Sequence, residues 1–176
     1  MTKTHLLGVY RTELNNIQLA YASLFLWSFP DTAEIFEELY KITDKNIPKP
    51  FTGIVALVHD QIAMKIAREE LYNSAYRTAL KDLFPLIKRY CHDTNQLDKL
   101  KAQPWFQFWR ILRNYFAHEM VFNFSKDEKP LLPISWSGIT IDLSMNGKSL
   151  THGQFTREKL YELLEVSKFF LIQDAA

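Results

Sequence analysis

The feature that most constrains this chain is an apolar and aromatic segment late in the sequence, residues 105–124, WFQFWRILRNYFAHEMVFNF. Its length and spacing predict a helix of about five turns. One side carries large apolar residues at helical spacing: Trp105, Phe108, Trp109, Leu112, Phe116 and Met120. Such a stripe is typical of a helix that packs one face into a core. The segment therefore predicts a helix buried along this stripe.

The other side of the predicted helix carries a line of polar residues: Gln107, Arg110, Asn114 and His118. Residues four apart stack one turn above the other, so Asn114 and His118 should share a face. Arg113 lies about 100° round from Asn114, where its long side chain can reach the same groove. A cation, an amide and an imidazole on an otherwise apolar helix are the sharpest chemical signal in the sequence.

The hexapeptide RNYFAH, Arg113 to His118, resembles the signature of the HEPN superfamily: an Arg, a polar residue that is often Asn, three residues and a His. HEPN domains are small α-helical bundles, and many are metal-independent endoribonucleases of toxin and antiviral defence systems. The resemblance covers the motif helix closely and the helical order loosely. It implies Arg113, Asn114 and His118 as catalytic residues, a homodimer in which two motif helices meet, and an antitoxin or regulatory partner.

The chemistry of these side chains suits RNA cleavage. An imidazole, with an ordinary pKa of about 6.5, can take a proton from a ribose 2′-OH or give one to the leaving 5′-oxygen. A guanidinium offers a forked, permanent charge to the phosphoryl oxygens, and Asn114 can hold the His tautomer or a phosphate oxygen. Because the 2′-OH is the nucleophile, the reaction demands no metal or other cofactor and leaves a 2′,3′-cyclic phosphate.

Other residues near the motif are candidates for holding RNA. Arg110 is the predicted substrate-binding residue, and Trp105, Trp109 or Tyr115 could stack on bases. Further basic residues that could line a groove are Lys88, Arg89, Lys99 and Lys101. Each of these, taken alone, is equally consistent with a solvated linker and core aromatics.

Composition limits the remaining possibilities. The 176 residues are 47% hydrophobic and 14% aromatic, enough for a sizeable core in one domain, 1–176. The net charge of +1 excludes a polycation, so binding of nucleic acid needs a local basic patch. The lone Cys91 favours a reducing compartment. Without an apolar leader or a run long enough to span a bilayer, the sequence predicts a cytoplasmic protein with no membrane partner. The histidines lack the spacing of metal ligands.

Helical periodicity organises the rest of the first two thirds of the chain. It predicts a first helix over 9–29, a short helix ending at Tyr40, and a long helical segment over 52–90. Pro85 should kink that segment or divide it. A polar linker, 92–103, follows, and Pro104 fits the first position of the motif helix.

The residue pattern changes after residue 124. A solvated turn at 125–130 precedes two stretches that alternate in polarity, 134–136 and 139–143, which predict a hairpin in a β insertion at about 131–151. Ser149-Leu150 could add a third strand. Thr156 should cap a closing helix whose buried face holds Leu160, Leu163, Leu164, Ser167, Phe170 and Leu171. The predicted fold is thus mainly α, a HEPN-type helical bundle with a small β-hairpin insertion before the C-terminal helix.

Three interpretations follow. The first is a metal-independent endoribonuclease of HEPN type. The second is a HEPN-like module without catalysis that binds RNA or nucleotides or serves dimerisation. The near-neutral charge favours the second, and so does Met120, where the toxin subgroup paired with nucleotidyltransferase antitoxins has a Tyr. The third is a plain helical interaction domain.

Overall fold

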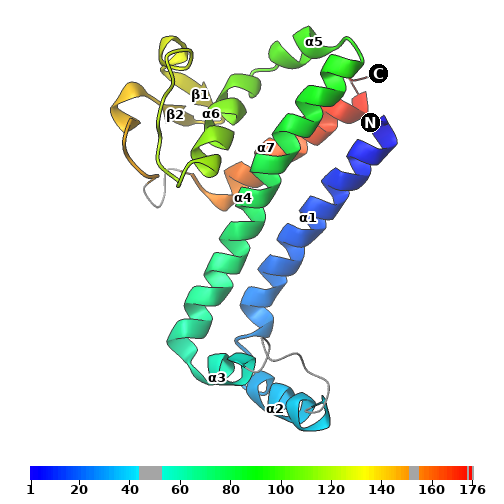
Figure 1. Cartoon of the computed structure of the whole chain (residues 1–176), viewed down its shortest axis with the longest axis vertical. Helices are drawn as coiled ribbons and strands as arrows, with labels where there is room; N and C mark the ends of the chain where they lie inside the picture. The colour runs from blue at the N-terminus through cyan, green and yellow to red at the C-terminus, as the bar shows by residue number, and fades with distance from the viewer. Residues whose placement is uncertain (44–52, 151–154, 174, 176) are drawn as a thin grey trace. The chain divides into compact units, whose positions relative to one another are not determined.

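The computed structural model describes residues 1–43, 53–150, 155–173 and 175 (Figure 1). This part of the chain is mainly helical, with a small two-stranded antiparallel hairpin before the C-terminal helix, which confirms the predicted class. In chain order the elements are α1 (Lys3–Leu26), α2 (Thr32–Thr43), α3 (Gly53–His59), α4 (Gln61–Asp93), α5 (Leu97–Lys101), α6 (Phe106–Ala117), η2 (Lys129–Leu131), β1 (Ile134–Trp136), β2 (Ile139–Ile141), η3 (Leu143–Met145) and α7 (Arg157–Gln173).

The contacts of the chain group these elements into two compact units. Unit 1 consists of Met1–Leu14 and Tyr76–Ala176, and unit 2 is Asn15–Ala75. Helices α1 and α4 are long enough to contribute one part to each unit. The motif helix α6, the hairpin and α7 all belong to unit 1.

The core of unit 1 lies between the start of α1, the second part of α4, α6 and α7. The buried Tyr10 hydroxyl lies 3.0 Å from Ser167 Oγ, which ties α1 to α7, and burial raises the pKa of Tyr10 above its ordinary value. Trp109 Nε1 on α6 donates to the carbonyl of Leu80 on α4 at 2.9 Å. The six residues predicted for the inner face of α7 are all buried: Leu160, Leu163, Leu164, Ser167, Phe170 and Leu171.

The hairpin has the predicted turn and the predicted first strand, and its second strand is shorter than predicted. Ile134 faces Ile141 and Trp136 faces Ile139 across the antiparallel pair. Ser137 and Gly138 between them both have positive φ, 48° and 80°, as expected of a two-residue hairpin turn. The second strand ends at Ile141, short of residue 143, and Ser149-Leu150 forms no strand, so the prediction of a third strand is wrong.

Several helix boundaries differ from those predicted. The long segment is broken at Asp60, whose Oδ1 accepts from the N–H groups of Ile62 and Ala63 and so caps α4. Helix α4 then runs through the exposed Pro85 to Asp93, so of the two predicted effects of Pro85, a kink or a division, the division does not occur. The predicted linker contains α5, and α6 begins two residues after Pro104. Thr156 does cap α7, through a 3.4 Å bond from the Lys159 N–H to its hydroxyl.

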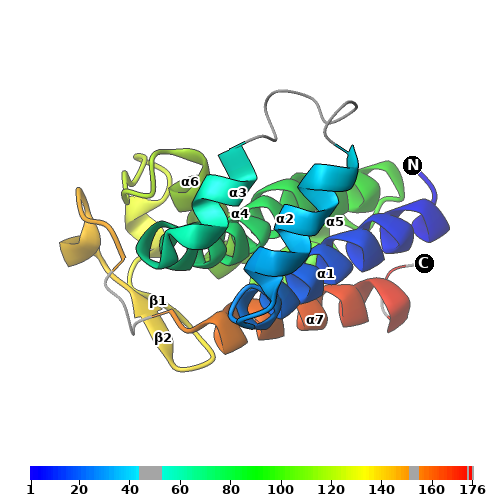
Figure 2. The same ribbon diagram turned by 90° about the horizontal axis from the view of Figure 1, so that it is seen from below.

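Unit 2 contains the second part of α1, α2, α3 and the start of α4. Helices α2 and α3 pack against each other, as both views in Figures 1 and 2 show. Trp27 stacks on Phe36 at a centroid distance of 4.7 Å, and Tyr21 lies 5.4 Å from Tyr72. Over the described residues of both units, no helix combines the length and the apolar character that crossing a membrane needs.

Candidate functional site

Helix α6 buries the apolar stripe that its sequence predicts, but only in part. The first four residues of that stripe are buried, whereas Phe116 is half-buried and Met120 is 39% exposed. The buried residues of the helix are Phe106, Phe108, Trp109, Ile111, Leu112 and Tyr115. On the other face, Gln107, Arg110 and Asn114 are half-buried. The predicted two-sided character of the segment is therefore correct for its first three turns.

The helix ends at Ala117, so the prediction that it continues to residue 124 is wrong. His118 is the C-cap residue, with φ −124° and ψ 74°, and its N–H still bonds to the Asn114 carbonyl at 3.1 Å. Glu119 and Met120 follow with positive φ, 56° and 55°, and the Val121 N–H closes the turn on the His118 carbonyl. Non-glycine residues adopt this conformation at a cost, so surrounding contacts must hold the turn.

Those contacts come from the β insertion. The Phe122 N–H donates to the Lys148 carbonyl at 3.0 Å, and the Gly147 N–H donates to the Phe122 carbonyl at 2.7 Å. The Phe124 N–H binds Asn146 Oδ1 at 3.0 Å. Phe122 and Phe124 are buried, 1% and 5% exposed. The chain leaves the helix at His118 because the next residues pair with a distant segment and bury their rings there.

A chain of hydrogen bonds connects the motif to a buried carboxylate. Arg113 Nη1 donates to Asn114 Oδ1 at 3.1 Å, and Asn114 Nδ2 donates to Glu128 Oε1 at 2.7 Å. The second oxygen of Glu128 accepts from the Ser125 N–H at 2.9 Å. Glu128 is only 4% exposed. Asn114 is thus fixed by a charged acceptor, and its own oxygen in turn orients the guanidinium of Arg113.

Glu128 is the functional candidate that the sequence prediction missed. It lies in 125–130, which was predicted to be a solvated turn, and its neighbour Asp127 is exposed as expected. One signal could have identified it. Ser125 and Glu128 have the spacing of a capping box, in which an acidic side chain reaches back to the N–H three residues earlier. The observed bond from the Ser125 N–H to Glu128 is that interaction.

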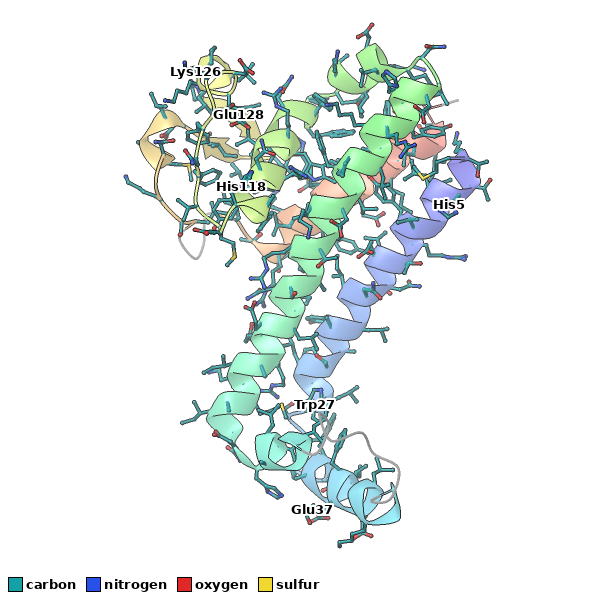
Figure 3. All side chains as sticks on the ribbon, in the orientation of Figure 1. His5, Trp27, Glu37, His118, Lys126 and Glu128 are labelled. Atoms are coloured by element: carbon teal, nitrogen blue, oxygen red, sulfur yellow. The ribbon has the colours of Figure 1, made fainter. Side chains whose placement is uncertain are left out.

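His118 is exposed and lies beside this network. Asn114, His118 and Glu128 line one small pocket of about 10 Å³, together with aromatic residues of the same unit. Figure 3 labels His118 and Glu128 in this part of unit 1. Tyr115 behind them is held by the Leu150 N–H, which donates to its hydroxyl at 3.2 Å. The structure therefore brings the motif residues to one end of α6, with the imidazole open to solvent.

The residues predicted to contact RNA differ in their accessibility. Trp105, Trp109 and Tyr115 are 3%, 0% and 5% exposed, so they are not free to stack on bases, and that prediction is wrong. Arg110 is half-buried on the polar face, one turn before Asn114. Of the other basic residues, Arg89 lies 3.8 Å from Asp93 and Lys101 lies 3.7 Å from Asp98. These pairs are exposed and weak, so both cations stay accessible to other anions.

No cluster of three or more His, Cys, Asp or Glu side chains that could hold a metal ion occurs among the described residues. Cys91 is fully buried, and burial raises the pKa of its thiol to about 11.

Comparisons with models of protein families, with curated proteins and with solved structures found no match to this chain.

Proposed function

We propose that the protein is a metal-independent endoribonuclease of the HEPN type, acting through Arg113, Asn114 and His118. The observation that carries the proposal is the arrangement at the end of α6. The guanidinium of Arg113 is oriented by Asn114, Asn114 is fixed by the buried Glu128, and the exposed His118 lies beside Asn114 and Glu128. A fixed cation and an accessible imidazole are the two groups that cleavage through a 2′-OH needs.

In the proposed reaction, His118 takes the proton of the ribose 2′-OH, and the freed oxygen attacks the adjacent phosphorus. Arg113 stabilises the charge that develops on the phosphoryl oxygens. The bond from phosphorus to the 5′-oxygen breaks, and that oxygen must receive a proton. The products are a 2′,3′-cyclic phosphate and a 5′-OH, so atoms and charge balance without a metal ion. Arg110, one turn before Asn114, binds a neighbouring phosphate of the RNA.

The proton for the leaving oxygen suggests a second imidazole. Two copies of the chain with their motif helices facing each other would supply one His118 as base and the other as acid. The buried aromatic residues of α6 cannot form that contact, so we infer that the half-buried polar face and the turn at Glu119-Met120 do. By resemblance to the HEPN superfamily, we propose a role in a toxin or antiviral system with an antitoxin or regulatory partner, in the cytoplasm that the sequence features predict.

A specific observation favours a second candidate. Met120 stands where the toxin subgroup has a Tyr, and its sulfur lies 3.3 Å from Arg77 Nη1. A HEPN-like module that binds RNA or nucleotides, or dimerises, without cutting RNA would keep Arg113 and Arg110 as phosphate ligands. It would not need a free imidazole at His118. RNA cleavage, which only the endoribonuclease would show, distinguishes the two candidates, whereas RNA binding does not.

The test is RNA cleavage in excess EDTA, with the ends of the products identified chemically. The wild type should leave 2′,3′-cyclic phosphate ends, and a DNA strand of the same sequence should stay intact because it lacks the 2′-OH. His118→Ala should lose the activity, and Arg113→Lys should lose most of it, since a point charge cannot replace the forked contact. His92→Ala, which removes another exposed imidazole of unit 1, is the matched control. RNA binding without cleavage by the wild type would instead support the non-catalytic module.

A further inference from the structure

Unit 2 contains a pocket of about 460 Å³ where four helix ends meet. Its walls are the turn that follows α1, the start of α2, the end of α3 and the start of α4. Trp27, labelled in Figure 3, is one of its lining residues. A volume of this size is typical of pockets that bind small molecules. The pocket lies entirely within unit 2, so the RNA chemistry proposed above makes no use of it.

The pocket is lined by cations in a unit that is otherwise acidic. Residues 15–75 contain five Lys and Arg against eight Asp and Glu. Among the described cations of this unit, Lys41 pairs with Glu38 at 2.7 Å, whereas Lys65 and Arg68 both line the pocket. These two residues are three apart on α4 and therefore lie on one face of the helix. Such a lining attracts an anionic ligand.

Arg68 has a donor directed to no partner. Its Nη1 donates to the Leu24 carbonyl at 3.0 Å, which anchors the guanidinium near the end of α1. Its Nε is buried and has no hydrogen-bond partner among the described residues. Buried N–H groups of this kind are nearly always satisfied in native proteins. Because Arg68 itself lines the pocket, a reorientation of its guanidinium towards a phosphate oxygen there would give this donor a charge-assisted hydrogen bond.

Three of the other lining residues carry rings: Trp27, Phe29 and His59. Trp27 is held by its stack on Phe36, and Phe29 is 62% exposed at the pocket. His59 lines the same pocket, and its Nε2 lies 2.6 Å from a carboxylate oxygen of Glu37, which fixes the ring. Flat, apolar ring surfaces beside two cations match a ligand that joins a planar base to a phosphate.

We propose that this pocket binds a nucleoside monophosphate, with the phosphate at Arg68 and Lys65 and the base against Trp27 and Phe29. Isothermal titration calorimetry on the full chain, with adenosine 5′-monophosphate, adenosine and inorganic phosphate as probes, tests it. The monophosphate should bind more tightly than either of its parts, because only it occupies both halves of the pocket. Binding by phosphate alone, or by adenosine alone, that equals the monophosphate would overturn the assignment.

Substitutions then locate the site. Arg68→Met and Lys65→Gln should each raise the Kd for the monophosphate about ten- to a hundredfold, because each removes a hydrogen bond to a charged group. Arg89→Met, on the same helix but in unit 1, is the matched control and should leave the Kd unchanged. Lys65 is exposed, so Lys65→Gln decides the question if Arg68→Met does not fold. An unchanged Kd in Lys65→Gln, or no binding of the monophosphate by the wild type, refutes the proposal.

Discussion

The two units of the protein distribute their apolar residues in opposite ways. Among the residues that the structure describes, 34 hydrophobic residues are buried, and 30 of them belong to unit 1; the four in unit 2 are Ile17, Ala20, Met64 and Tyr72. Of the fifteen large hydrophobic residues that are exposed in the described parts of the chain, ten belong to unit 2. Unit 1 thus has a core of its own that fixes the motif residues. Unit 2 presents apolar side chains to its surroundings and gains little stability from burying them.

The charged residues are also distributed differently in the two units. Unit 1 contains sixteen Lys and Arg against twelve Asp and Glu, and unit 2 contains five against eight. The net charge of +1 is therefore the sum of a basic unit and an acidic one, +4 and −3. Attraction of an RNA backbone depends on the local excess. The near-neutral total is consequently a weaker argument against RNA binding by unit 1 than it seemed from the sequence alone.

The largest predicted effect is the difference in stability between a Leu→Ala substitution in unit 1 and one in unit 2. Leu83→Ala in unit 1 removes a side chain that is 0% exposed and should cost about 2–5 kcal/mol of unfolding free energy. Leu19→Ala in unit 2 removes one that is 70% exposed and should change it by about 0.5 kcal/mol or less. Urea unfolding measures both, and both positions lie in helices. A cost at Leu19 as large as that at Leu83 would mean that the surface of unit 2 is covered in solution.

The second prediction concerns activity. His118→Ala should lower the rate of RNA cleavage by about 10²–10³-fold with little change in Tm, because the exposed imidazole has few packing contacts to lose. Leu19→Ala, in unit 2, should leave that rate unchanged, since unit 1 contains every residue of the proposed site. Single-turnover cleavage and thermal melts on the same preparations make the comparison. If the unit 2 variant lost activity to a similar extent, the site could not belong to unit 1 alone.

The features that the sequence predicted correctly are those that local periodicity determines. The face of α7 and the two hairpin strands follow from spacing within a few residues, and both match the structure. The end of α6 could not be predicted in this way, because apolar residues continue from His118 to Phe124 as they would in a helix. Only the pairing of Phe122 with the chain around Lys148, far along the sequence, ends it.

The candidate site, too, could be predicted only where it depends on the local sequence. Arg113, Asn114 and His118 were predicted from a short pattern, and in the structure they lie at the end of α6. The burial of Glu128 was not identified, because an acidic residue among Ser, Lys and Asp has the composition of a solvated turn. Its role depends on Asn114, fourteen residues earlier, which brings a polar partner to it in the folded state.

The third prediction tests that partner. Glu128→Ala should cost about 1–3 kcal/mol, because the Asn114 amide and the Ser125 N–H both lose a buried acceptor. It should also lower cleavage, since Asn114 no longer holds Arg113 in place. Asp127→Ala, at the exposed neighbouring position, is the control and should do neither. A double-mutant cycle with Asn114→Ala measures the coupling between Glu128 and Asn114, and strictly additive effects would argue that the bond contributes nothing.

The smallest predicted effect concerns pH and a surface cluster in unit 1. Lys159 Nζ donates to Glu162 Oε2 at 3.0 Å and to Ser137 Oγ at 2.7 Å, and Ser137 Oγ donates to the Glu162 carboxylate at 3.0 Å. The hydrogen bond from Lys159, and then that from Ser137, lowers the pKa of Glu162 below its ordinary value. The cluster ties the hairpin turn to α7. In unit 2, by contrast, Glu38 pairs with Lys41 inside a single helix.

A carboxyl group whose pKa is lower in the folded than in the unfolded state stabilises the fold above the unfolded-state pKa, and this contribution is lost as the pH falls through the folded-state pKa. Glu162→Gln should therefore lower Tm slightly near pH 7, and the difference from the wild type should shrink as the pH falls through the lowered folded-state pKa of Glu162. Glu38→Gln should show a smaller difference at neutral pH, because its pair joins no two elements. Thermal melts across this range measure both variants. A Glu162→Gln difference that persists undiminished in acid would show that the side chain holds the hairpin turn to α7 by packing rather than by its charge.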